Sequence, residues 1–129
     1  MRIAVFSDVH ANREALLEVE KRLSEEKIDR IFFLGDAVGY NADPELCVQR
    51  IFSLTETMVR GNHDKTVCQL ENLEWFNQTA REALLWTRNA LQEASLGKLL
   101  GMRAGPLLVE GRYLICHGSP MDEDLYITQ

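Results

Sequence analysis

The stretch RIAVFSDVHAN, residues 2–12, begins with an apolar run and ends in polar residues. The run RIAVF, residues 2–6, predicts a short buried strand, because continuous apolar segments of this length are typical of covered sheets. Asp8 and His10 follow at the point where this strand would end. An acid and an imidazole at that point form either an ordinary polar turn or part of a metal site. The residues that follow the other predicted strands discriminate between these two interpretations.

Strand and helix signals alternate through the first half of the chain. Asn12 is placed to cap the first helix, and Asp43 with Pro44 is a strong helix start. Strands that alternate with helices predict an α/β fold, in which a parallel sheet is covered on both faces. The predicted order is strand 2–6, helix 12–25, strand 30–35, helix 43–52 and strand 56–62.

The second half is organised differently. Residues 78–93 have apolar side chains at helical spacing, and Asn77 is placed to cap this helix. The stretch LLVEGRYLICHGSP, residues 107–120, predicts a hairpin, since two apolar runs flank Glu110 and Gly111 and a two-residue turn favours glycine.

Length and composition predict one globular domain over residues 1–129. The 20 acidic and 14 basic residues give a net charge of −6, which argues against general binding to nucleic acid or to anionic membranes. No apolar run approaches the roughly 20 residues needed to span a bilayer, and the apolar start is too short for a signal peptide. The cysteines Cys47, Cys68 and Cys116 form no metal-binding pattern and predict free thiols in the cytoplasm.

Polar side chains follow every predicted strand of the first half. Besides Asp8 and His10, these residues are Asp36 in GDAVGY and Asn62, His63 and Asp64 in GNHD. His117 in CHGSP lies at the end of the predicted hairpin strand. Each motif alone has an ordinary explanation as a turn or a half-buried histidine. Together they predict a metal site, because the carboxyl ends of neighbouring parallel strands meet at one edge of the sheet.

The side-chain types indicate which metals this site would prefer. Carboxylates, an amide oxygen and imidazoles without thiolates suit Mn²⁺, Fe or Zn²⁺ better than Ca²⁺ or a structural zinc. A shared carboxylate such as Asp36 would bridge two ions about 3.5–4 Å apart, and paired metals at this spacing suit phosphate ester hydrolysis.

The motif order DxH, GDxxG, GNHD and HG resembles that of the calcineurin-like metallophosphoesterases. The segments SDVHAN, GDAVGYNADPELC, VRGNHD, FNQTAREALLWT and CHGSP are similar to a bacterial and archaeal branch of small phosphodiesterases. The resemblance implies an αββα sandwich with a dinuclear site between its two sheets. The loop GDAVGY differs from the GDxVDRG of the protein phosphatases and therefore favours small phosphodiesters as substrates.

The resemblance also implies a role for each residue. Asp8 and His10 would bind the first metal, Asp36 would bridge both metals, and Asn62 and His117 would bind the second. His63 would face the substrate and assist the leaving group, while Asp64 would orient and polarise His63. Asn12 and Tyr40 are weaker candidates for substrate contacts, with helix capping and loop packing as the alternatives. The expected cofactors are two divalent ions, Mn²⁺ first, with Fe, Zn²⁺ or Ni²⁺ as alternatives.

The sequence departs from the family pattern at one motif. The family has a further GHxH motif that supplies one histidine to each metal, and this sequence contains no such motif. We therefore expect a truncated sandwich with an incomplete second sheet, either as a fragment or as a natural short form. An open sheet edge would favour a homo-oligomer.

Three functional hypotheses remain open from the sequence. The first is an enzyme that hydrolyses phosphodiesters or phosphomonoesters with a hydroxide activated by two metals. The second is a catalytically impaired or non-catalytic metal-binding module of the same fold. The third, a structural role without metal, leaves the residues at the strand ends unexplained.

Overall fold

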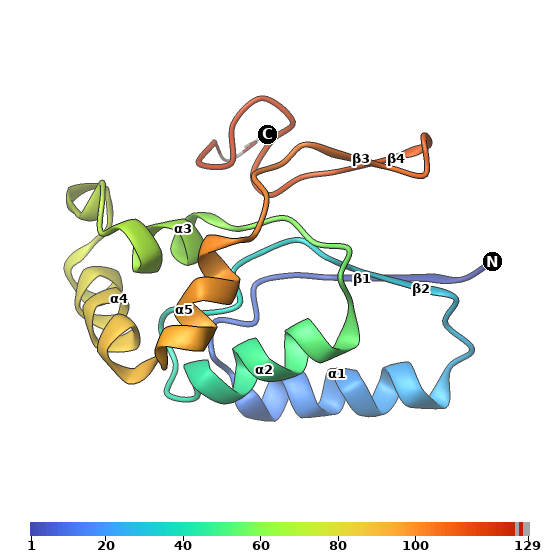
Figure 1. The fold of residues 1–129 in the computed structure, drawn as a ribbon, viewed down its shortest axis with the longest axis horizontal. Helices are drawn as coiled ribbons and strands as arrows, with labels where there is room; N and C mark the ends of the chain where they lie inside the picture. The colour runs from blue at the N-terminus through green and yellow to red at the C-terminus, as the bar shows by residue number, and fades with distance from the viewer. Residues whose placement is uncertain (126, 128–129) are drawn as a thin grey trace.

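The computed structural model describes residues 1–125 and 127, and its centre is a parallel pair of strands, β1 (Ile3–Phe6) and β2 (Arg30–Phe33). Helices α1 (Arg13–Glu25) and α2 (Pro44–Leu54) lie along one side of this pair, and a hairpin lies on the other (Figure 1). The predicted α/β class is therefore confirmed. The remaining elements are α3 (Asn62–Gln69), a 3-10 turn (Leu73–Trp75), α4 (Gln78–Ala90), α5 (Glu93–Leu100), β3 (Leu107–Val109) and β4 (Tyr113–Ile115).

Strand β2 separates two apolar clusters because successive side chains of a strand point to opposite faces. Phe33 is fully buried in the larger cluster, which is formed mainly by side chains of the helices. Phe32 belongs to a smaller cluster with Val59 and Ile115, on the side of the hairpin. The sheet is thus covered thickly on the helical side and by the hairpin on the other.

The first two helices begin where the sequence predicts. The Asn12 side chain accepts a hydrogen bond from the Ala15 N–H at 3.0 Å and caps α1. Helix α2 begins at Pro44 after Asp43, so the missing N–H of proline falls in the first turn, where no intrahelical partner is needed.

The third predicted strand, residues 56–62, is wrong in its extent. This segment forms a single parallel bridge between Met58 and Phe33. Pairing stops there because the next N–H that would face β2, that of Gly61, donates to the Asp64 carboxylate at 2.9 Å. The Arg60 N–H points away from β2 and donates to the Arg103 carbonyl at 2.8 Å. Asn62 then begins helix α3, which the sequence analysis does not predict.

The predicted helix 78–93 ends early, because α4 stops at Ala90, and the separate helix α5, from Glu93 to Leu100, is not predicted by the sequence analysis. Glu45 at the start of α2 fixes the corner between them. Its carboxylate accepts hydrogen bonds from the Gln92 N–H at 3.0 Å and from the Ser95 hydroxyl at 2.8 Å. These bonds favour a new helix start at Gln92 over continuation of α4.

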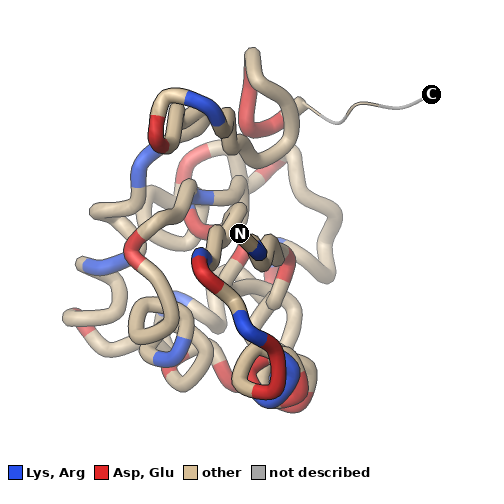
Figure 2. The backbone as a smooth tube through the Cα atoms, turned by 90° about the vertical axis from the view of Figure 1, so that its right-hand side faces the viewer, with Lys and Arg blue, Asp and Glu red and all other residues tan. Residues whose placement is uncertain are grey.

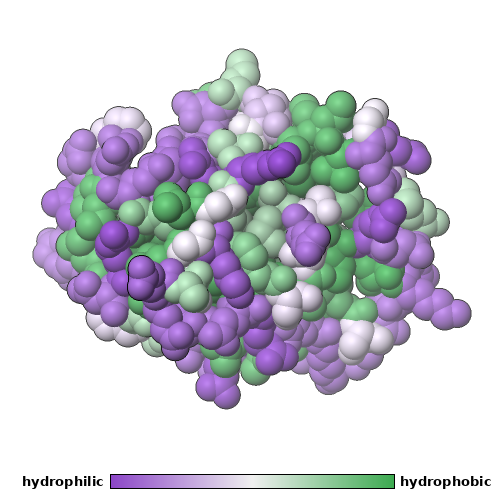
Figure 3. Space-filling view, in the orientation of Figure 1, coloured by the Kyte–Doolittle hydropathy of each residue, from purple (hydrophilic) through white to green (hydrophobic). Residues whose placement is uncertain are grey.

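Strands β3 and β4 form the predicted hairpin, and among the described residues they are the second sheet. The turn residues Glu110 and Gly111 both have positive φ, and the Arg112 N–H donates to the Val109 carbonyl at 3.1 Å. An apolar groove of about 510 Å³ lies between this hairpin and the first sheet and includes Val5 and Leu114, which are more than half exposed. Hydrophobic atoms are visible around the hairpin in Figure 3.

Acidic and basic residues are interspersed along the backbone (Figure 2). Over the part of the chain that the structure describes, no helix is both long enough and apolar enough to cross a membrane.

Candidate metal centre

The loops that follow β1 and β2 run side by side and form the floor of the candidate site. The ladder of backbone hydrogen bonds continues past the strands, from the Asp8 N–H to the Gly35 carbonyl at 2.9 Å and from the His10 N–H to the Asp36 carbonyl at 3.0 Å. Asp8, His10 and Asp36 all have positive φ, with values of 56°, 48° and 59°. Non-glycine residues adopt this conformation at a cost, and such residues concentrate at functional sites.

Asp64 joins these loops to helix α3. Its fully buried carboxylate accepts hydrogen bonds from the backbone N–H groups of Gly61 (2.9 Å), Asp36 (2.8 Å) and Ala37 (2.9 Å). The sequence analysis expects Asp64 to polarise His63, but the hydrogen bonds of this carboxylate in the described structure go to these backbone amides. Its observed role is to hold the loop after β2 against the start of α3.

Glycine is required where these segments approach each other. A Cβ atom on Gly61 would overlap Oδ1 of Asp36, and one on Gly39 would overlap Nδ1 of His63. The glycines of GNHD and GDAVGY therefore allow the backbone to reach the site residues closely.

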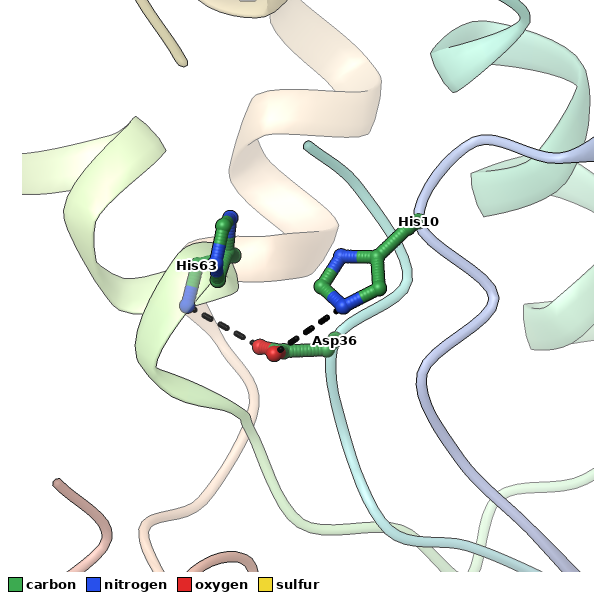
Figure 4. Close-up of side chains that lie close together, drawn as sticks. All are labelled: His10, Asp36 and His63. Atoms are coloured by element: carbon green, nitrogen blue, oxygen red, sulfur yellow. Dashed lines mark hydrogen bonds and ion pairs between the residues drawn. The ribbon is translucent and has the colours of Figure 1, made fainter. Parts of the chain in front are cut away.

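The Asp36 carboxylate lies at the centre of the site (Figure 4), only 2% exposed. Its Oδ1 accepts a hydrogen bond from the His63 N–H at 2.9 Å. Its Oδ2 lies 3.6 Å from Nε2 of His10 and 3.5 Å from Nε2 of His117. One carboxylate oxygen thus faces imidazoles from the two ends of the chain.

Two further side-chain oxygen atoms flank these imidazoles. Oδ1 of Asp8 lies 3.7 Å from Nε2 of His10, and Oδ1 of Asn62 lies 3.1 Å from Nε2 of His117. The structure therefore brings together all five residues for which the sequence predicts metal binding: Asp8, His10, Asp36, Asn62 and His117.

Backbone carbonyls determine which imidazole nitrogens are available in this site. Nδ1 of His10 lies 3.0 Å from the Val38 carbonyl, and Nδ1 of His117 lies 2.7 Å from the Leu34 carbonyl. A carbonyl oxygen only accepts, so both Nδ1 atoms carry the proton, and in the neutral rings the Nε2 lone pairs face the carboxylate and amide oxygens. Metal-binding histidines in proteins are oriented in this way.

The charges around Asp36 fit a divalent cation. Burial, followed by the neighbouring Asp64 carboxylate, raises the pKa of Asp36 to about 9. Electron-rich atoms thus converge on a carboxylate that lacks a compensating charge from a Lys or Arg side chain among the described residues. Bound divalent ions would supply that charge.

His63 is enclosed by rings at the edge of this cluster. Its ring centroid lies 4.7 Å from that of His10, 4.9 Å from that of Tyr40 and 5.1 Å from that of Phe76. Burial, with a smaller contribution from the nearby histidines, lowers the pKa of His63 to about 4, so the ring is neutral at pH 7. Its Nδ1 is buried and has no hydrogen-bond partner among the described residues.

The two predicted substrate contacts differ in their surroundings. Asn12 uses its side-chain oxygen to cap α1. Tyr40 is 48% exposed, has a φ of 63° and places its ring 5.0 Å from the ring of His10. Tyr40 therefore forms a wall of the site, whereas the observed role of Asn12 is structural.

Sequence reasoning missed an ion-pair cluster that holds the segment after His117. Arg60 donates two hydrogen bonds to the Glu123 carboxylate, at 2.8 and 3.0 Å. Lys65 lies 3.1 Å from Glu123 and 2.6 Å from Asp124. Arg60 and Glu123 are 63 positions apart in the sequence, and Lys65 and Asp124 are 59 apart. Opposite charges alone give no signal that could pair residues over this distance.

Comparison with known proteins shows the family of this chain. The family described as calcineurin-like phosphoesterase matches residues 1–128. An uncharacterized protein of Methanocaldococcus jannaschii is 36% identical, over 96% of this chain and 52% of its own length. The crystal structure of a metallophosphoesterase from Sphaerobacter thermophilus superposes with a TM-score of 0.77 at 38% identity, over 98% of this chain and 51% of that one.

A second solved structure, of a protein provisionally assigned as a diadenosine tetraphosphatase, has a TM-score of 0.66 at 18% identity. It covers 92% of this chain and 50% of that one, and at this identity it supports the fold alone. The chain belongs to the calcineurin-like phosphoesterase family, whose members use divalent metal ions. It spans about half the length of the relatives that it matches.

Proposed function

We propose that this chain forms the N-terminal part of a metal-dependent phosphoesterase domain that hydrolyses small phosphodiesters or phosphomonoesters. The observation that carries the proposal is the convergence of two imidazole Nε2 atoms on one oxygen of Asp36, at 3.5 and 3.6 Å. A shared buried carboxylate between two sets of ligands is the arrangement that paired metal ions require. Mn²⁺ is the favoured ion, with Fe, Zn²⁺ or Ni²⁺ as alternatives.

The protein residues then divide into three roles. Asp8, His10, Asp36, Asn62 and His117 hold two divalent ions, which would activate a water molecule and neutralise negative charge on the phosphoryl oxygens. His63 donates an N–H hydrogen bond to the phosphoryl group or to the leaving oxygen, which its neutral ring permits. Asp64 positions the loops, and Tyr40 contacts the substrate.

Hydrolysis of bis-p-nitrophenyl phosphate with added Mn²⁺ tests this proposal. We expect p-nitrophenolate release that requires metal and that falls about a hundredfold or more in His63→Ala, the size typical for loss of one hydrogen-bond donor to developing negative charge. The Mn²⁺ content of His63→Ala should equal that of the wild type, because His63 is outside the proposed ligand set. Equal hydrolysis by the wild type and His63→Ala would contradict the role of His63.

The alternative function is a non-catalytic metal-binding module. The observation in its favour is that the Asp8 side chain is 55% exposed, so that the first set of ligands is open to solvent. Hydrolysis that stays at the background rate with Mn²⁺, Fe²⁺, Zn²⁺ and Ni²⁺, in protein that still binds metal, would favour this module over the enzyme.

A homo-oligomer and a cytoplasmic location are further parts of the proposal. The apolar groove beside the hairpin, with Val5 55% and Leu114 57% exposed, supports contact with a second copy along this face. Light scattering should give twice the mass of the chain, and a stable monomer at micromolar concentration would contradict the oligomer. The free thiols of Cys47, Cys68 and Cys116 are compatible with a reducing compartment.

A further inference from the structure

A groove of about 540 Å³ lies next to the candidate metal centre, between the loop after β2 and helix α4. Tyr40 and Trp86 are among its lining residues, and their side chains are 48% and 50% exposed. Aromatic side chains lose favourable burial when they face water, so two half-exposed rings in one groove indicate a surface suited to a flat apolar group.

The groove is continuous with the site through one residue. The ring of Tyr40 lines the groove and also contacts the rings of His10 and His63, at centroid distances of 5.0 and 4.9 Å. A phosphoester held at the metal centre would therefore direct a substituent on this side past Tyr40 and towards Trp86.

Polar groups of the groove restrict the chemistry of that substituent. Glu82 on α4 offers carboxylate oxygens, one of which also accepts a hydrogen bond from the Gln78 side chain at 2.9 Å. Asn41 has its side-chain N–H bound to the His10 carbonyl, which leaves its side-chain oxygen as an acceptor. These acceptors favour a ring that carries N–H donors. The charge of Glu82 disfavours a second phosphate, and a purely aliphatic group would leave the acceptors unpaired.

We propose, on the basis of the phosphoesterase function above, that this groove binds the base of a nucleoside phosphoester. In this arrangement the planar heteroaromatic ring stacks on Trp86, and its N–H donors face Glu82 and Asn41. Trp86 determines specificity for the group attached to phosphorus and takes no part in the bond cleavage itself.

Calorimetric titration of the Mn²⁺-loaded chain with two ligands, adenosine 5′-monophosphate and ribose 5-phosphate, tests this inference. Both ligands carry the same phosphate, and only one carries a base. The wild type should bind adenosine 5′-monophosphate about tenfold more tightly, a preference within the range for stacking of one base on an aromatic side chain. Trp86→Ala should bind both ligands equally, and Trp86→Phe should keep most of the preference.

Trp75 provides the matched control, because it is also an exposed tryptophan, at 69%, but lies outside the groove. Trp75→Ala should retain the full preference for the ligand with a base. Equal affinity of the wild type for the two ligands, or an unchanged preference in Trp86→Ala, would overturn the inference that the groove binds a base. In either case, binding of ribose 5-phosphate would leave the phosphoesterase proposal intact. Failure to bind either ligand would overturn both.

Discussion

The two ends of the chain meet at the candidate metal centre, but different interactions hold them there. The loops after β1 and β2 are joined by backbone hydrogen bonds and by the buried Asp64 carboxylate, which accepts three amide N–H bonds. The segment after His117 is held by charged side chains, through the pairs of Glu123 with Arg60 and of Asp124 with Lys65. The difference indicates that the loops after β1 and β2 form with the core, whereas the segment after His117 depends on ion pairs that a mutation can remove separately.

The largest expected effect is from Asp64→Ala. This change leaves the N–H groups of Gly61, Asp36 and Ala37 without their acceptor, and each buried unpaired group costs about 1–3 kcal/mol. We expect the free energy of unfolding, measured in urea, to fall by about 3 kcal/mol or more, even after relief of the repulsion with Asp36. A loss below about 1 kcal/mol would contradict the anchoring role of Asp64.

Removal of the ion pair at the other end should have a smaller effect. The Glu123 and Arg60 side chains are 11% and 23% exposed, so Glu123→Gln should lower the free energy of unfolding by about 1–3 kcal/mol, between the values for exposed and buried pairs. Because Glu123 holds the segment after His117, the variant should also bind its more weakly held Mn²⁺ less tightly. Calorimetric titration with Mn²⁺ measures the affinity of both sites. Equally weakened binding of both ions would contradict the claim that the segment after His117 is held independently of the loops after β1 and β2.

The same carboxylate should make stability depend on pH in the acid range. Burial acts to raise the pKa of Glu123, but hydrogen bonds and charges from Arg60 and Lys65 outweigh it and lower the pKa below its usual 4.5. A lowered pKa in the folded state stabilises the fold above pH 4.5, and this stabilisation is lost as the pH falls through the folded pKa. In urea unfolding from pH 6 to pH 3, the free energy of unfolding should fall more steeply for the wild type than for Glu123→Gln. Parallel curves would contradict the assignment of this pH dependence to Glu123.

The smallest expected effect is from Glu110→Gln, which removes an ion pair with Arg30 at the tip of the hairpin. These side chains are 41% and 56% exposed at a separation of 2.9 Å, and solvent screens such pairs. We expect a change in the free energy of unfolding below about 0.5 kcal/mol, with no change in Mn²⁺ affinity. A larger effect than that of Glu123→Gln would show that burial does not rank these ion pairs.

The sequence predicts the core of the site well because the site lies at strand ends. Apolar runs locate β1 and β2, and the polar residues Asp8, His10 and Asp36 directly after them lie together in the structure. The hairpin is also predicted, since Glu110 and Gly111 adopt the positive φ values that a tight turn requires.

The remaining features depend on contacts between distant residues. GNHD resembles an ordinary turn in sequence, yet it begins α3, because the Asp64 carboxylate that accepts the Gly61 N–H also binds the loop after β2. The end of the third predicted strand depends on the same Asp64 carboxylate, which accepts the Gly61 N–H that would otherwise continue the pairing with β2. Trp86 resembles any surface tryptophan until its helix is placed beside Tyr40.

Metal stoichiometry tests the central claim most directly, that Asp36 is shared by two divalent ions. The chain would be loaded with Mn²⁺, passed through a desalting column and measured by mass spectrometry of the metal, beside Asp36→Asn as the matched variant. The account predicts two ions per wild-type chain and a loss of both in Asp36→Asn. One ion or none in the wild type, or two ions retained in Asp36→Asn, would contradict it.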